Sequence, residues 1–149
     1  MLELKIGDKS PVFEGVNQNN ETIKSIDLLG KKVVIFFYPK ASTPGCTAEA
    51  CDLRDNYEHF LNKNYEVIGV SADSVKRQKS FSDKNNLPYS LIADEDKKII
   101  EAFGVWGPKK FMGREYDGIH RTTFVIDEKG KIENIITKVK TKNHAEQIL

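Results

Sequence analysis

The chemistry of this chain centres on Cys46 and Cys51, the only two cysteines in its 149 residues. Thr43 and Pro44 precede Cys46; threonine is a favoured N-cap, and proline suits the first helical position. A helix that begins there makes Cys46 its third residue, among unpaired backbone N–H groups at the positive end of the helix dipole. Such surroundings favour the reactive thiolate. The sequence therefore predicts a nucleophilic cysteine at the start of a helix.

The composition is that of an ordinary globular protein, with 39% hydrophobic residues, 30% charged residues and a formal net charge of +1. We expect one domain over residues 1–149. The small net charge predicts no nucleic-acid or anionic-membrane partner, and the longest apolar run is far shorter than a membrane span. The first residues lack an apolar signal segment, so we expect a cytoplasmic protein. Two cysteines in such a protein are more typical of redox or metal chemistry than of a structural disulfide.

Alternating strands and helices are predicted to position the cysteines. The most apolar run, residues 33–38, has no polar alternation, which is typical of a central strand covered on both faces. A single helix is expected over residues 43–62, because apolar side chains recur there at steps of three and four. The other expected elements are a hairpin around residues 17–20, strands at 65–70, 89–93, 121–126 and 132–139, helices from Asp73 or Ser74 to 85 and from 94 to 104, and a short last helix opened by Thr141 or Asn143.

This order predicts an α/β fold with a mixed central β-sheet flanked by helices. The thioredoxin-like fold has the same order of elements. The last two strands are expected to pair as a hairpin about a turn at residues 127–130. The segment around Trp106 is expected to combine packing with an exposed loop.

The spacing Pro39-x-x-x-Thr43-x-x-Cys46 resembles the active-site signature of the peroxiredoxins. The wider stretch over residues 37–55 is similar to the bacterioferritin comigratory protein, or peroxiredoxin Q, branch of that family. The similarity continues through residues 103–113 and 116–127, so it covers nearly the whole chain.

The resemblance implies a thiol-dependent peroxidase that reduces hydrogen peroxide and organic hydroperoxides. Cys46 would attack the peroxide and become a sulfenic acid, and Cys51 would resolve it as an intramolecular disulfide. Thioredoxin or a similar dithiol protein would then reduce that disulfide. The resemblance also implies a monomer, and it places the remaining site residues at Pro39, Thr43 and Arg121.

Physical chemistry gives each of these residues a task. Arg121 would supply a fixed positive charge to the thiolate and the transition state. Thr43 would donate a hydrogen bond to the peroxide if capping does not consume its hydroxyl group, and Pro39 would shield the thiolate from water. Thiol chemistry needs no metal, flavin or haem, and the three histidines lack a zinc-ligand spacing with the cysteines.

Several alternatives stay open at this point. Glu49 lies one turn beyond Cys46, where it either pairs with a basic residue or is solvated. Cys51 is incidental if an external thiol resolves the sulfenic acid. A general thiol–disulfide oxidoreductase is the competing enzyme class, although it favours two residues between its cysteines and this chain has four. A binding module without catalysis is the third alternative.

The cysteine spacing carries a geometric consequence. On one helix, Cys51 lies about 140° around the axis from Cys46, with Cα atoms about 8–9 Å apart. A disulfide needs Cα atoms within about 7 Å and converging Cβ vectors. We therefore predict that the first turns of the helix unwind when the disulfide forms.

Overall fold

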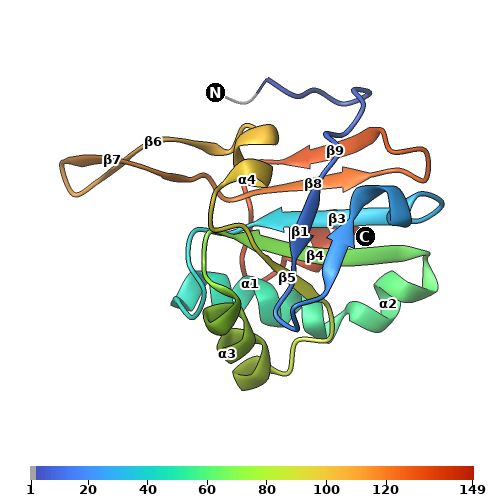
Figure 1. The fold of residues 1–149 in the computed structure, drawn as a ribbon, viewed down its shortest axis with the longest axis horizontal. Coiled ribbons are helices and arrows are strands. Elements are labelled where there is room, and N and C mark those ends of the chain that lie inside the picture. Colours follow the sequence, from blue (N-terminus) through green and yellow to red (C-terminus); the bar gives the residue numbers. More distant parts are fainter. Residues whose placement is uncertain (1–2) are drawn as a thin grey trace.

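The core of the fold is a five-stranded sheet with the strand order β5-β4-β3-β8-β9, and the computed structural model describes residues 3–149 (Figure 1). Three strands run parallel, namely β3 (Lys32–Phe37), β4 (Tyr65–Ser71) and β5 (Ser90–Ala93). On the other side of β3, β8 (Thr122–Ile126) pairs antiparallel to β3, and β9 (Ile132–Ile136) pairs antiparallel to β8. The predicted α/β class with a mixed sheet is confirmed.

The central strand β3 is buried on both faces, as its unbroken apolar run predicts. Val34 and Phe36 point into one hydrophobic cluster, and Val33 and Ile35 point into another. The first cluster packs under α1 (Pro44–Asp55), α2 (Tyr57–Asn62), α3 (Val75–Asn85) and α5 (His144–Ile148), and the second packs under α4 (Lys98–Ala102). The helix that carries both cysteines is therefore fixed to the sheet by a closed apolar layer.

Two short hairpins lie outside the main sheet. The predicted N-terminal hairpin is present as β1 (Glu14–Val16) and β2 (Thr22–Lys24), followed by the 3-10 helix η1 (Ser25–Leu28). A second hairpin pairs β6 (Trp106–Phe111) with β7 (Arg114–Ile119) and projects from the body of the molecule (Figure 1). Trp106 packs against the core and most of the rest of the segment is exposed, as expected, but it forms a hairpin and not an irregular loop. Its two turn residues, Met112 and Gly113, both adopt positive φ, which matches the twist of a tight hairpin.

The single helix expected over residues 43–62 was also wrong, because the chain breaks at Asn56 into α1 and α2. The Asn56 side-chain amide donates to the carbonyl of Asp52 at 2.9 Å, and the Asn56 backbone N–H bonds to Leu53 instead. Asparagine competes for backbone groups in this way and therefore favours helix ends. The last strand ends at Ile136 rather than at residue 139.

No helix within residues 3–149 is long and apolar enough to span a membrane.

Candidate active site

The loop after β3 delivers Cys46 to the start of α1. Pro44 is the first helical residue, and Cys46 is the third, as expected from the sequence. The Cys46 side chain is buried, with 1% of its surface exposed. The sulfur therefore lies at the positive end of the helix dipole, in the first turn of α1.

Thr43 occupies the N-cap position, but its side chain does not cap the helix. Its hydroxyl group instead donates to the carbonyl of Lys40 at 2.7 Å. The expectation of a side-chain cap was therefore wrong, because the hydroxyl oxygen accepts no N–H of the first helical turn and the group donates to the preceding loop. The hydroxyl group is only half-buried and is not held by the helix, so a rotation about one bond frees its proton.

A buried carboxylate holds the loop before the helix. The backbone N–H of Ala41 donates to Asp73 Oδ2 at 2.8 Å, and the Ser71 hydroxyl group donates to the same oxygen at 2.7 Å. Pro39 is half-buried in this loop, two residues after the end of β3. The sequence suggested Asp73 only as a helix cap. Its contact with the loop joins residues 32 apart in the chain, so no local pattern indicates it.

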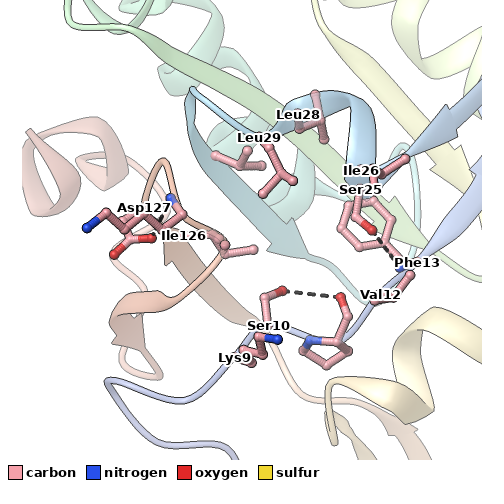
Figure 2. A pocket seen from close by; sticks show the side chains of 14 residues that line it. Lys9, Ser10, Val12, Phe13, Ser25, Ile26, Leu28, Leu29, Ile126 and Asp127 are labelled. Atoms are coloured by element: carbon pink, nitrogen blue, oxygen red, sulfur yellow. Dashed lines mark hydrogen bonds between the residues drawn. The ribbon is translucent and has the colours of Figure 1, made fainter.

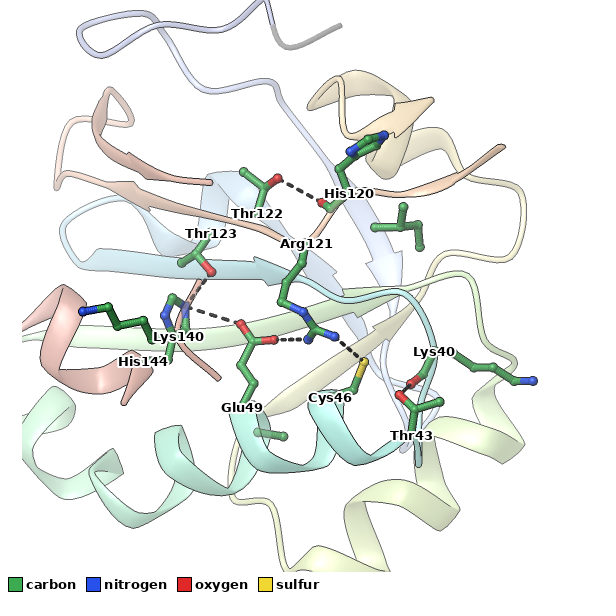
Figure 3. Close-up of polar contacts among 12 residues, drawn as sticks. Lys40, Thr43, Cys46, Glu49, His120, Arg121, Thr122, Thr123, Lys140 and His144 are labelled. Atoms are coloured by element: carbon green, nitrogen blue, oxygen red, sulfur yellow. Dashed lines mark hydrogen bonds and ion pairs between the residues drawn. The ribbon is translucent and has the colours of Figure 1, made fainter. Parts of the chain in front are cut away.

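Arg121 reaches Cys46 from the segment between β7 and β8 (Figure 3). Its Nη2 donates to Cys46 Sγ at 3.3 Å, and its Nη1 donates to Glu49 Oε1 at 2.6 Å. Burial opposes the charge of Arg121, but the negative charges of Cys46 and Glu49 outweigh it and raise the pKa of Arg121. The fold thus places the permanent positive charge of Arg121 within hydrogen-bond distance of the Cys46 sulfur.

Glu49 is the main functional candidate that the sequence left undecided. Its side chain is fully buried and pairs with Arg121, so the solvated alternative was wrong. Burial raises the pKa of Glu49 to about 7, although Arg121 acts in the opposite direction. The spacing was the available signal, because residues three apart on a helix lie on the same face.

Cys51 faces away from this cluster. Its Sγ lies 3.6 Å from Asn85 Oδ1 at the end of α3, and Arg54 Nη1 donates to the Asn85 carbonyl at 2.7 Å. Both cysteines are free, and they lie within one unbroken helix with different polar partners. A disulfide between them therefore needs a change in the path of the helix.

A pocket of about 340 Å³ lies elsewhere, between the N-terminal segment and the sheet (Figure 2). Its apolar lining includes Val12, Phe13, Leu29 and Val33. Val33 is at the start of β3, whereas Cys46 follows the end of that strand. This pocket therefore takes no part in the chemistry of the thiol. Among residues 3–149, no cluster of three histidine, cysteine or acidic side chains is arranged to hold a metal ion.

A buried thiol at a helix start, with an arginine on its sulfur and a thioredoxin-like fold around it, defines a thiol-based redox enzyme. Residues 6–135 match the AhpC/TSA family. The chain belongs to this family and is a peroxiredoxin, that is, a thiol-dependent peroxidase. Enzymes of this kind take a peroxide as substrate and a thiol as reductant.

Relatives of known name and structure agree with this assignment. The chain is 45% identical to Peroxiredoxin Bcp of Escherichia coli K12 over 149 residues, which is 100% of this chain and 96% of that protein. A crystal structure of a cysteine-to-serine mutant of Xylella fastidiosa PrxQ superimposes with a TM-score of 0.92 at 30% identity, covering 98% of this chain and 93% of that one. A structure of the Xanthomonas campestris bacterioferritin comigratory protein, from work on its alkyl peroxide reduction activity, superimposes with a TM-score of 0.86 at 32% identity, covering 91% of this chain and 87% of that one. The thioredoxin-like fold is thereby confirmed.

Gly45→Ala is expected to slow the reaction with peroxide without weakening the fold. A Cβ atom at residue 45 would lie 3.3 Å from Arg121 Nη2, the atom that donates to the sulfur. Displacing this donor by a few tenths of an ångström costs about fivefold in rate, given that about 1 Å of misplacement can cost a hundredfold. Alanine also favours the helix by up to about 1 kcal/mol over glycine. Stopped-flow kinetics and urea unfolding measure the two effects, and an unchanged rate constant would contradict the expectation.

Proposed function

We propose that Cys46 is the peroxidatic residue of this peroxiredoxin. The observation that carries the proposal is the 3.3 Å contact between Arg121 Nη2 and Cys46 Sγ at a helix start. The thiolate attacks one peroxide oxygen, the O–O bond breaks, and Cys46 becomes a sulfenic acid. The second oxygen leaves with the electron pair and takes a proton to form an alcohol or water.

The neighbouring residues divide the work of this step. Arg121 holds its charge beside both the sulfur and the departing oxygen, where negative charge moves during the reaction. The Thr43 hydroxyl group turns from the Lys40 carbonyl to the bound peroxide, and Pro39 offers no donor that would compete for the thiolate. The positions of Thr43 and Pro39 in the loop that leads to Cys46 support their roles, and the contact of Arg121 with the sulfur supports its role.

The proposed substrates are hydrogen peroxide and organic hydroperoxides. The named alkyl peroxide reduction activity of the Xanthomonas campestris relative supports the second class. The reaction centre needs only the peroxide bond, so the group attached to it is free to vary.

Cys51 is proposed as the resolving residue. Its thiolate attacks the sulfur of the Cys46 sulfenic acid and forms an intramolecular disulfide. The hydroxide that is expelled takes up a proton and leaves as water. Thioredoxin or a similar dithiol protein then reduces this disulfide by exchange. We further propose that the enzyme works as a monomer in the cytoplasm, where thiol reductants are abundant.

The decisive experiment mixes pre-reduced protein with peroxide in a stopped-flow instrument and follows both cysteines by mass spectrometry. We expect fast, stoichiometric peroxide loss, a sulfenic acid on Cys46, and then a Cys46–Cys51 disulfide. The same preparation should reduce insulin disulfides poorly. Efficient insulin reduction together with slow peroxide loss would instead favour a general thiol–disulfide oxidoreductase.

Cys51→Ser is expected to separate the two half-reactions. The first turnover should keep its wild-type rate, because Cys46 and its contact with Arg121 are intact. Cycling with thioredoxin and its reductase should fail, and sulfenic or over-oxidised Cys46 should accumulate. If the variant cycles at the wild-type rate, Cys51 is not the resolving thiol.

Disulfide formation is expected to open the start of α1. Cys46 must leave Arg121, or Cys51 must leave Asn85, before the sulfurs can meet. Amide hydrogen exchange over residues 43–55 should therefore be faster in the disulfide form than in the reduced form, while α4 on the opposite face of the sheet exchanges equally in both. Equal protection of residues 43–55 in the two forms would show that no unwinding is needed.

A further inference from the structure

The C-terminal helix α5 places His144 beside Glu49, the partner of Arg121 (Figure 3). His144, its first residue, is fully buried, and its Nε2 lies 3.4 Å from Glu49 Oε2. The backbone N–H of Ala145 donates to Asp52 Oδ2 at 2.8 Å. Both contacts join α5 to α1. Glu49 lies between the two cysteines in the sequence, and Asp52 directly follows Cys51.

The hydrogen bonds of Gln147 fix which nitrogen of His144 carries a proton. The Gln147 Oε1 accepts the backbone N–H of Lys140 at 2.8 Å, and its Nε2 donates to the carbonyl of Lys138 at 2.9 Å. The same Oε1 lies 2.8 Å from His144 Nδ1. Because an amide oxygen only accepts, Nδ1 must be the donor and carries the proton.

The second nitrogen of His144 is therefore the one that titrates. It lies 2.7 Å from Thr123 Oγ1 and faces Glu49 Oε2. That carboxylate oxygen is buried and has no hydrogen-bond partner among the residues that the structure describes. A buried carboxylate oxygen in this state carries a large desolvation cost, which a proton on either Glu49 or His144 relieves.

We propose that Glu49 and His144 form a buried acid–base pair that holds one proton in the reduced enzyme, and that His144 is a positioning residue for the attack by Cys46. The proposal rests on the peroxidatic role of Cys46 given above. While the pair holds its proton it is neutral as a whole, so the charge of Arg121 compensates the sulfur. Once the proton is lost to solvent, the ionised Glu49 competes with the sulfur for the same guanidinium group.

The surroundings of the pair bring the titration of its proton near neutral pH. Burial raises the pKa of Glu49 to about 7 against the influence of Arg121. Burial also lowers the pKa of His144, and the charge of Arg121 lowers it further. The hydrogen bond to Gln147 and the charge of Asp52 act in the opposite direction and raise this pKa. On the side of the sheet, burial raises the pKa of Tyr89, so this hydroxyl group stays neutral.

Nuclear magnetic resonance of the wild-type protein tests the pair directly. We would titrate reduced protein between about pH 5 and 9 and follow the His144 ring nitrogens and the Glu49 carboxyl carbon. We expect the Nδ1–H tautomer at neutral pH and one titration step that appears in both residues. An Nε2–H tautomer, or a Glu49 step to which the His144 ring does not respond, would overturn the proposal. This measurement is independent of any enzymatic activity.

Kinetics test the positioning role. The second-order rate constant with hydrogen peroxide is measured against pH for wild type, for His144→Gln and for the control His59→Gln, which changes an exposed histidine on α2. We expect the rate constant to fall as the pair loses its proton. In His144→Gln this fall should begin at lower pH by about half a unit, or about threefold in proton concentration, because an amide cannot take up the proton.

The outcomes separate the two proposals. Wild-type and His144→Gln profiles that superimpose would overturn the positioning role while leaving Cys46 as the peroxidatic residue. Slow peroxide reduction by the wild type at every pH would instead overturn the proposed function. If His144→Gln does not fold, the titration of the wild-type protein still decides whether the pair exists.

Discussion

Replacing Cys46 with serine is expected to reduce peroxide turnover to the uncatalysed background. A serine hydroxyl group has no accessible anionic form near neutral pH, and the Arg121 guanidinium is already protonated, so it cannot remove the hydroxyl proton. The fold should persist, because serine is close to cysteine in size and Arg121 keeps its partner Glu49. Loss of the whole catalytic step makes this the largest effect expected for any single substitution in the chain.

The measurement is peroxide consumption under single-turnover and steady-state conditions, with circular dichroism as the check on folding. Cys51→Ser is the matched control, because it removes the other thiol and should retain the first turnover. If Cys46→Ser consumes peroxide at the wild-type rate, another group performs the chemistry and the proposed role of Cys46 fails.

Arg121→Met should slow peroxide reduction by about a hundredfold or more. Removing one donor from a developing anion typically costs on the order of 2.7–4 kcal/mol of transition-state stabilisation. Methionine keeps much of the apolar stem of arginine but lacks its charge and its two directed donors. The variant also leaves Glu49 buried without its cation, so its stability should fall as pH rises through the ionisation of that carboxyl group.

The second-order rate constant from stopped-flow measurements tests this expectation. Arg121→Lys should fall between wild type and Arg121→Met, because lysine restores the charge without the fork that reaches both Cys46 and Glu49. Arg114→Met is a matched control, since Arg114 is exposed on β7 and has no ion pair among the described residues. A rate constant for Arg121→Met equal to that of wild type would place Arg121 outside the reaction.

The sequence by itself determined the features that depend on neighbouring residues. Thr43, Pro44 and Cys46 define a helix start with the thiol in its first turn, and the unbroken apolar run of β3 defines a strand buried on both faces. Both signals are local, because cap preferences act within one turn and side-chain alternation acts within one strand. The order of elements then limits the fold to a mixed sheet flanked by helices.

Fine local features were harder to predict where two local preferences competed. The periodicity of apolar residues favoured one long helix, but the side chain of Asn56 took a backbone carbonyl and divided it. Thr43 was well suited to cap α1, yet its hydroxyl group donates to the Lys40 carbonyl and does not cap the helix. In both cases a short polar side chain donates to a nearby backbone carbonyl whose position depends on the folded path of the backbone.

Only the tertiary structure decided the electrostatics of the site. Arg121 stands 75 residues from Cys46 and 72 residues from Glu49 in the chain, and the pairing of β8 with β3 brings it to both. His144 reaches Glu49 because α5 docks on α1, which no periodicity or motif in its own short segment indicates. Charges interact through space and burial removes the competing water, so the partners of a titratable group, and the cost of ionising it, are fixed only when distant segments meet.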